Sequence, residues 1–268
     1  SSIFKPFQTL IINYQRRSCK GVRCSSLFFK YRHKDLDFDN PDMVTINGAV
    51  NTLNYPVRQG ISYQKDQFFL TARYKPMNSL SLLSTYEFSH QKRDDIEEWP
   101  ILPDETNKHN INLTAHVRPL NKLKLKAVYD YTHYENPAYN TEPDNSNRLR
   151  LSGTSLPVPW MTAYVNYVLA LTDRDDLRYL NSNPHLVLEG GERDGRTDNF
   201  LTSLSFAFSP EASLTASWAY NRWKVEQDLA YSQWGASGKP YYDSSVPYTD
   251  EANTLSLSLF YLLRKDLT

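Results

Sequence analysis

The two cysteines are the first residues whose spacing could carry chemistry. Cys19 and Cys24 stand in the stretch Cys-Lys-Gly-Val-Arg-Cys, and the sequence has no other cysteine. A structural zinc site needs four ligands, commonly two closely spaced pairs. The single pair therefore favours a local disulfide or two free thiols over a metal or redox centre. No Cys-x-x-Cys-His stretch occurs, so the chain attaches no haem of its own.

The histidines and acidic residues give little support to catalysis. A hydrolytic centre would group a serine with a histidine and an orienting Asp or Asn. The sequence shows no such grouping around its histidines, which are His33, His90, His109, His116, His133 and His185. Asp94, Asp95, Asp175 and Asp176 could bind a divalent ion, but solvated loop charge is their ordinary role. The sequence predicts no enzyme, no metal site and no cofactor.

Composition narrows the class of protein further. The 30 basic and 30 acidic residues balance, which gives no reason to expect a nucleic-acid partner. No run of about 18 apolar residues exists, so a transmembrane helix is excluded, whereas alternating transmembrane strands average to a polar composition. Residues 1–24 carry no recognisable signal peptide and form an amino-terminal segment of uncertain order.

A hairpin over residues 107–134 is the clearest element. Ile111 and Leu113 alternate with Asn112 and Thr114, which is the period of a strand. Each arm runs for about 10 to 12 residues, close to the length that crosses a bilayer as a tilted strand. Similar alternation predicts strands near residues 27–32, 44–53, 59–75, 80–89, 147–156, 160–172, 198–209, 214–228 and 253–263.

The connections between these strands alternate in length. Short turns are predicted at 76–79, 119–122, 157–159, 210–213 and 264–266, and long loops at 91–106, 135–146, 173–197 and 229–252. In a meander this places all tight turns at one end and all long loops at the other, as in outer-membrane barrels. A propeller or a soluble β-sandwich explains the long strands and the one-sided loops less well.

The fold class is therefore all-β, an antiparallel up-and-down transmembrane barrel over residues 25–268 with the long loops extracellular. The strand count comes to eleven, an odd number where a closed bacterial barrel has an even one. We accordingly expect a partial barrel whose remaining strands come from a longer parent chain. Two aromatic girdles are predicted, with Tyr74, Trp160, Phe208 and Tyr261 beside the tight turns and Phe88, Tyr131 and Tyr220 toward the long loops.

Alternation also predicts which side chains face the lumen. The polar candidates for contact with a partner inside the barrel are Arg73, Lys75, Glu87, Asn112, His116, Arg118, Lys124, Lys126, Asp130 and Asn166. A generic solvated lumen would have a similar lining. Phe69, Val128, Tyr164 and Val168 point the same way and add apolar area, which suits a docked protein better than an open pore.

Several stretches resemble the MtrB/PioB family, the barrel component of porin-cytochrome electron conduits. They are Val-Arg-Pro-Leu-Asn-Lys-Leu-Lys-Leu-Lys at 117–126, Tyr-Asp-Tyr-Thr-His at 129–133, Asn-Pro-Ala-Tyr at 136–139, Arg-Asp-Asp-Leu at 174–177 and Gln-Asp-Leu-Ala-Tyr at 227–231. The resemblance covers roughly residues 55–263. The family's amino-terminal Cys-x-x-Cys is not matched by Cys19 and Cys24.

The resemblance implies a function in the bacterial outer membrane. In that family the barrel sheathes a periplasmic multihaem c-type cytochrome, which passes electrons to a cell-surface cytochrome or mineral. We therefore expect an outer-membrane barrel that supports electron transfer, with membrane lipid and the cytochrome as partners. A solute-passing porin is the alternative, and a soluble or surface-attached β protein that binds a partner is a third class.

Overall fold

The computed structural model describes residues 8–20, 23–38, 40–47, 52–57, 60–94, 96, 99, 101–180, 187–231, 241–244 and 247–262. All regular structure in these residues is β-strand. No helix in this part of the chain has the length and apolar character needed to cross a membrane.

Long antiparallel strands form one meander sheet. Each strand pairs with its neighbours along the chain, apart from the short strands set within the long connections. The long strands are β1 (Gln8–Lys20), β2 (Arg23–Leu36), β5 (Ser62–Met77), β6 (Leu80–Asp94), β7 (Glu105–Leu120), β8 (Leu123–Glu135), β9 (Asn145–Val158), β10 (Met161–Arg174), β13 (Arg193–Ser209), β14 (Ala212–Tyr231) and β16 (Tyr248–Tyr261).

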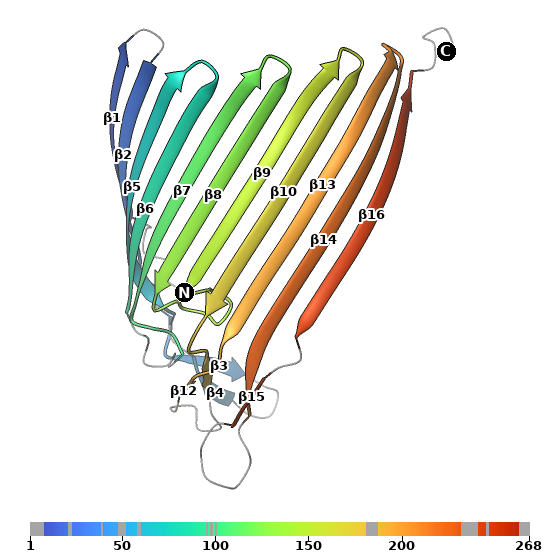
Figure 1. The fold of residues 1–268 in the computed structure, drawn as a ribbon. Coiled ribbons are helices and arrows are strands. Elements are labelled where there is room, and N and C mark those ends of the chain that lie inside the picture. Colours follow the sequence, from blue (N-terminus) through green and yellow to red (C-terminus); the bar gives the residue numbers. More distant parts are fainter. Residues whose placement is uncertain are drawn as a thin grey trace.

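The predicted hairpin is confirmed, and so is the asymmetry of the connections. β7 pairs with β8 through Leu113 opposite Tyr129, and residues 121–122 form the turn. Figure 1 shows the long strands side by side in chain order, with the tight turns together at the top and the long connections at the bottom. The strands extend further into the long connections than the alternation predicted; β13, for example, begins at Arg193.

Two assignments near the amino terminus differ from the sequence prediction. The run at 44–53 is not a strand of the main sheet, because β3 (Met43–Asn47) and β4 (Thr52–Pro56) pair only with each other. Five residues are too few to cross a bilayer. Conversely, β1 lies in the segment where no strand was predicted, and it pairs with β2 along its whole length.

The long connections carry the remaining short strands. β11 (Arg178–Leu180) pairs with β12 (Val187–Glu189) between β10 and β13. β15 (Tyr241–Ser244) pairs with the end of β14, beyond the part of β14 that pairs with β16. These short pairs lie at the long-connection end of the sheet in Figure 1.

The two faces of the sheet differ in polarity and in crowding. Val165 and Val168 belong to the same strand, β10, and point to opposite faces, yet their exposed fractions are 40% and 7%. Side chains on the concave side of a curved sheet converge and shield one another, so Val168 marks the concave face. The exposed, convex face carries large apolar side chains that include Leu70, Leu113, Leu151 and Leu204.

The sheet is an open partial barrel. Among the described residues, β1 and β16 form its two edges and do not pair with each other. Figure 1 shows β1 to β6 nearly edge-on and β9 to β16 more nearly face-on, as expected for a sheet that curves. The predicted turn at 264–266 lies outside the described residues.

Candidate functional site

The ten polar residues predicted to line the lumen lie on one face of the sheet. Strand register establishes this, because residues directly opposite each other in a ladder share a face. One row across the sheet, for example, joins Thr85, Asn112, Asp130 and Arg148. The same register places on this polar face Arg73, Lys75, Glu87, His116, Lys124, Lys126 and Asn166, together with Phe69, Val128, Tyr164 and Val168. Arg118 lies in the irregularity between Val117 and Leu120 and is assigned to this face by alternation along β7.

Asp130 is the centre of a hydrogen-bonded group on the polar face. The Nδ2 of Asn112 donates to Asp130 Oδ2 at 2.9 Å, and the Nδ2 of Asn110 donates to Asp130 Oδ1 at 2.9 Å. The Asn110 amide also contacts Thr132 Oγ1 at 2.8 Å, and Thr114 Oγ1 donates to Asn112 Oδ1 at 3.1 Å. This group joins β7 to β8 and holds the Asp130 carboxylate by two amide donors.

A second polar group lies one row nearer the long connections. Gln67 Nε2 donates to Glu87 Oε1 at 3.3 Å, and Lys108 Nζ lies 3.5 Å from Glu87 Oε2. Glu87 thereby links β5, β6 and β7. The polar face carries charge of both signs in this half of the sheet.

Toward the tight turns the polar face of β7 and β8 is basic. His116, Arg118, Lys124 and Lys126 are all exposed, and we call these four residues the basic cluster. No carboxylate lies within ion-pairing distance of them among the described residues. Two of them, His116 and Lys126, are directly opposite each other in the ladder. The positive charges of Arg118, Lys124 and Lys126 are therefore available to an external partner.

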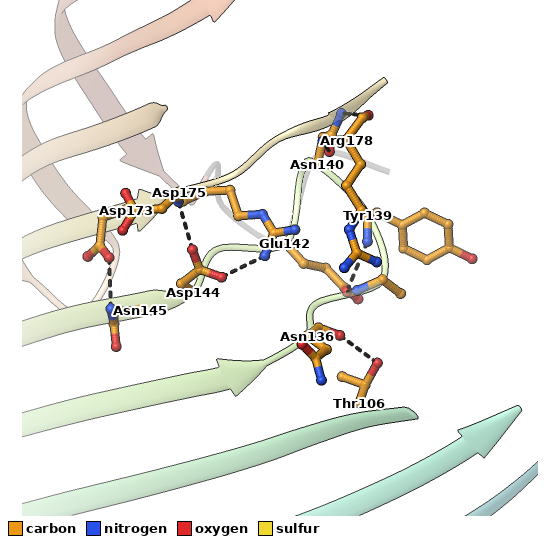
Figure 2. A network of polar contacts seen from close by, with 12 residues as sticks. Thr106, Asn136, Tyr139, Asn140, Glu142, Asp144, Asn145, Asp173, Asp175 and Arg178 are labelled. Carbon is orange, nitrogen blue, oxygen red and sulfur yellow. Dashed lines mark hydrogen bonds and ion pairs between the residues drawn. The ribbon is translucent and has the colours of Figure 1, made fainter. Parts of the chain in front are cut away.

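The loop between β8 and β9 is held by a network of polar contacts at the other end of the sheet. Figure 2 shows Asp144 accepting from the backbone of Asp175, Asn145 reaching Asp173, and Thr106 reaching Asn136. The Asp144 and Asp175 contact measures 2.7 Å. Asn140 further joins this loop to β11 through two hydrogen bonds with the backbone of Arg178.

The cysteines and acidic loop residues do not form a metal centre in the described part of the chain. Cys19 lies opposite Cys24 in the β1–β2 ladder, and Cys24 is disulfide-bonded. Within the described residues no group of three or more His, Cys, Asp and Glu side chains could hold a metal ion. Asp95, one of the four acidic loop residues considered above, lies outside the described residues.

Aromatic residues form a continuous row on the convex face. Tyr31, Phe68, Phe88, His109 and His133 are directly opposite one another across five strands, with neighbouring ring centroids 4.8 to 6.5 Å apart. The sequence predicts Phe88 in this girdle, but only the strand register shows that the five rings form one row. Near the tight turns Tyr74, Trp160, Phe208 and Tyr261 are 46% to 65% exposed.

Several arginines of the polar face are absent from the predicted lumen-facing set. Arg148 lies opposite Asp130, and Arg150 lies opposite Val128, in the β8–β9 ladder. The alternation of these arginines with Leu149 and Leu151 is visible in the sequence and could have identified them. Arg174 and Arg193 were also missed because both lie within a segment predicted to be a loop.

Comparison with protein families decides what kind of barrel this is. Residues 22–156, half of the chain, match the outer membrane beta-barrel porin family MtrB/PioB. The chain belongs to the MtrB/PioB family. The matched part contains the β7–β8 hairpin on which the resemblance rested, while the stretches at 174–177 and 227–231 lie beyond it. Membership places the protein in the outer membrane, so the convex apolar face contacts lipid.

Solved structures support the same architecture for this MtrB/PioB chain. The closed form of the ferric-catecholate import receptor Fiu from E. coli K12 superposes with a TM-score of 0.57 at 10% identity, covering 96% of this chain and 48% of Fiu. The open form gives a TM-score of 0.52 at 9% identity, with coverages of 96% and 52%. The chain thus spans about half the length of these receptors. No curated protein matches it significantly.

Proposed function

We propose that this barrel sheathes a multihaem c-type cytochrome and so supports electron transfer across the outer membrane. The observation that carries the proposal is the composition of the concave face. Mixed charge, hydrogen-bonded amides and apolar side chains such as Phe69 and Tyr164 share it. A folded protein can match such a surface at many points, since protein interfaces combine apolar contact with satisfied polar groups.

The basic cluster gives the proposed interface a direction. Its four side chains lie near the tight turns, which face the periplasm in outer-membrane barrels. Unpaired positive charge there favours encounter with an acidic protein surface arriving from the periplasm. In this arrangement the barrel supplies insulation and position, while the cytochrome's haems carry the electrons.

The test is retention of a haem-staining partner after detergent extraction of the outer membrane. We expect the wild-type barrel to retain it. The double variant Lys124→Glu with Lys126→Glu, which reverses two charges of the basic cluster, should lose most of it. Asn121→Glu is the control, because it adds a negative charge in the adjacent tight turn without altering the polar face. Absence of any haem-staining partner from the wild type would reject the proposal.

A solute-passing porin is the second candidate, and the porin description of the family favours it. A porin and a sheath differ in whether the purified barrel is active without a partner. A porin conducts ions in a planar bilayer as the only protein present, and the charge-reversed variant would then shift its selectivity toward cations. A barrel that works only as a sheath needs its partner for activity.

A further inference from the structure

A cavity lies at the long-connection end of the polar face, between β10, β13, β14 and the loop after β8. Its volume is about 170 Å³. The main groups that line it are Arg174, Arg193, Thr172, Thr197, Trp223 and Asn140. It is therefore walled by two guanidinium groups, hydroxyl and amide groups, and one indole ring.

The two arginines of this cavity lie directly opposite each other in the β10–β13 ladder. Like charges in that arrangement destabilise a sheet unless something neutralises them. Arg174 is neutralised, because its Nη1 lies 2.6 Å from Asp144 Oδ1 and its side chain is only 6% exposed. Among the described residues the only hydrogen-bond partner of Arg193 is a neutral acceptor, the backbone oxygen of Asn140, which lies 3.3 Å from its Nη1. The cavity thus keeps one uncompensated positive charge.

Arg174 also keeps an unused donor. Its buried Nε has no hydrogen-bond partner in the described residues. A buried donor without an acceptor costs free energy, and more so when it belongs to a charged group. Both features call for the same complement, an anion that can accept several hydrogen bonds.

Gly195 also lines the cavity. It lies on β13 between Arg193 and Thr197, on the same face, and is directly opposite Thr172 in the ladder. A methyl group at this position would overlap the Thr172 hydroxyl. Glycine at this position therefore lets the Thr172 hydroxyl lie against the β13 backbone, where Thr172 Oγ1 is 3.5 Å from the Gly195 carbonyl oxygen.

We propose that this cavity binds a carboxylate group. A carboxylate can accept two hydrogen bonds from one guanidinium in a planar fork, and the hydroxyl of Thr197 can donate to a remaining lone pair. Two sources share this chemistry: a small carboxylate solute in the lumen, or an acidic side chain of a protein inside the barrel. Only the second source rests on the proposed sheath function.

Trp223 provides the readout, since its ring lines the cavity and is 45% exposed. The experiment titrates the purified barrel in detergent with trichloroacetate, an anionic quencher of tryptophan fluorescence, and separately with the neutral trichloroethanol. We expect saturable quenching by trichloroacetate that acetate competes away and acetamide does not, and unsaturable quenching by trichloroethanol. The saturable part should disappear in Trp223→Phe.

Variants then assign the site. Arg193→Gln should weaken the apparent affinity for trichloroacetate by about tenfold or more, the effect of losing one charged hydrogen bond. Arg196→Gln is the matched control, because Arg196 lies on the same strand but on the opposite face, paired with Asp198 at 2.7 Å. Quenching that does not saturate in the wild type, or that is unchanged in Arg193→Gln, would overturn the proposal. The acetate and acetamide comparison needs no variant, so a folding defect cannot obscure the result.

A last comparison separates the two sources. If an acidic side chain of the partner occupies the cavity, the intact complex should show no saturable quenching, and removal of the partner should restore it. If the ligand is a free solute, barrel and complex should behave alike. Because the first titration uses the barrel alone, a missing cytochrome would reject the proposed function without touching this result.

Discussion

Leu113 and Tyr129 lie directly opposite each other in the β7–β8 ladder, both on the convex face, with exposed fractions of 45% and 39%. In water such a pair would leave much of its apolar surface solvated, which is unfavourable. Neighbouring positions of the same face repeat the arrangement, including Leu70, Ile111 and Leu151. Exposure of these apolar side chains is favourable in lipid, and family membership places the protein in the outer membrane.

The first prediction tests this assignment of faces. Leu113→Arg should cost about 2 to 4 kcal/mol and impair assembly, because it places a charge in the lipid near the middle of a strand. His116→Arg, an exposed position on the polar face of the same strand, should assemble normally. The measurement is heat-modifiability on gels together with outer-membrane yield. Equal tolerance of the two arginines would show that the faces are assigned wrongly.

Sequence predicted the strands where alternation is clean and missed one where it is not. In β1, Leu10, Ile11 and Ile12 are consecutive apolar residues and Arg16 and Arg17 are consecutive charged ones, so the period of two is hidden. These three side chains are nonetheless 47% to 54% exposed and belong to a paired strand. The run at 44–53 showed alternation over a sufficient length, but its two halves pair with each other as β3 and β4 and not with the main sheet.

The candidate site could also be predicted only in part. Alternation alone placed Asn112 and Asp130 on one face, because the face depends only on position within each strand. That the two residues are hydrogen-bonded depends on register, which tight turns with bulges can shift by a residue. The β7–β8 ladder does shift between Val117 and Leu120. Arg174 and Arg193 could not be paired from sequence for the same reason.

The second prediction concerns topology. Tyr139→Cys, in the loop after β8 where Tyr139 is 60% exposed, should react with a membrane-impermeant maleimide added to intact cells. Asn121→Cys, in the tight turn of the β7–β8 hairpin, should react only after the outer membrane is permeabilised. The native disulfide at Cys24 keeps the background low. The reverse pattern of labelling would invert the barrel.

The third prediction concerns the Asp130 group. Asp130→Ala removes the acceptor of the half-buried Asn110 and Asn112 amides and should destabilise the barrel by about 1 kcal/mol or somewhat more, because these donors lose their partner without full access to water. Asp130→Asn should recover part of this, since its carboxamide oxygen can still accept. Lys126→Ala, an exposed neighbour on the same face, should change stability by about 0.5 kcal/mol at most. Unfolding in urea in the presence of lipid vesicles measures all three, and a harmless Asp130→Ala would mean that water replaces the carboxylate.

The last prediction is a pH dependence at the long-connection end. Partial desolvation, and then the carboxylates of Asp144, Asp173, Asp176 and Asp194, raise the pKa of Asp175 above its ordinary value of 3.8. The folded state therefore binds this proton more tightly than the unfolded chain does. Stability contributed by this group is greatest at low pH and is lost as pH rises through the raised folded pKa.

Replacing the carboxylate should remove this dependence. At pH 7, Asp175→Asn should slow amide hydrogen exchange in the loop after β10 relative to the wild type, because the repulsion is gone. The difference should shrink as pH falls and vanish below 3.8, where the wild-type group is protonated in both the folded and the unfolded state. Asp176→Asn removes only one of the neighbouring carboxylates and should give the same trend to a smaller extent. Two results would contradict this prediction: faster exchange in Asp175→Asn than in the wild type at pH 7, or a difference in exchange rate that grows as pH falls. Either would show that the Asp175 carboxylate stabilises the loop, and that the backbone hydrogen bond from Asp175 to Asp144 does not replace this contribution.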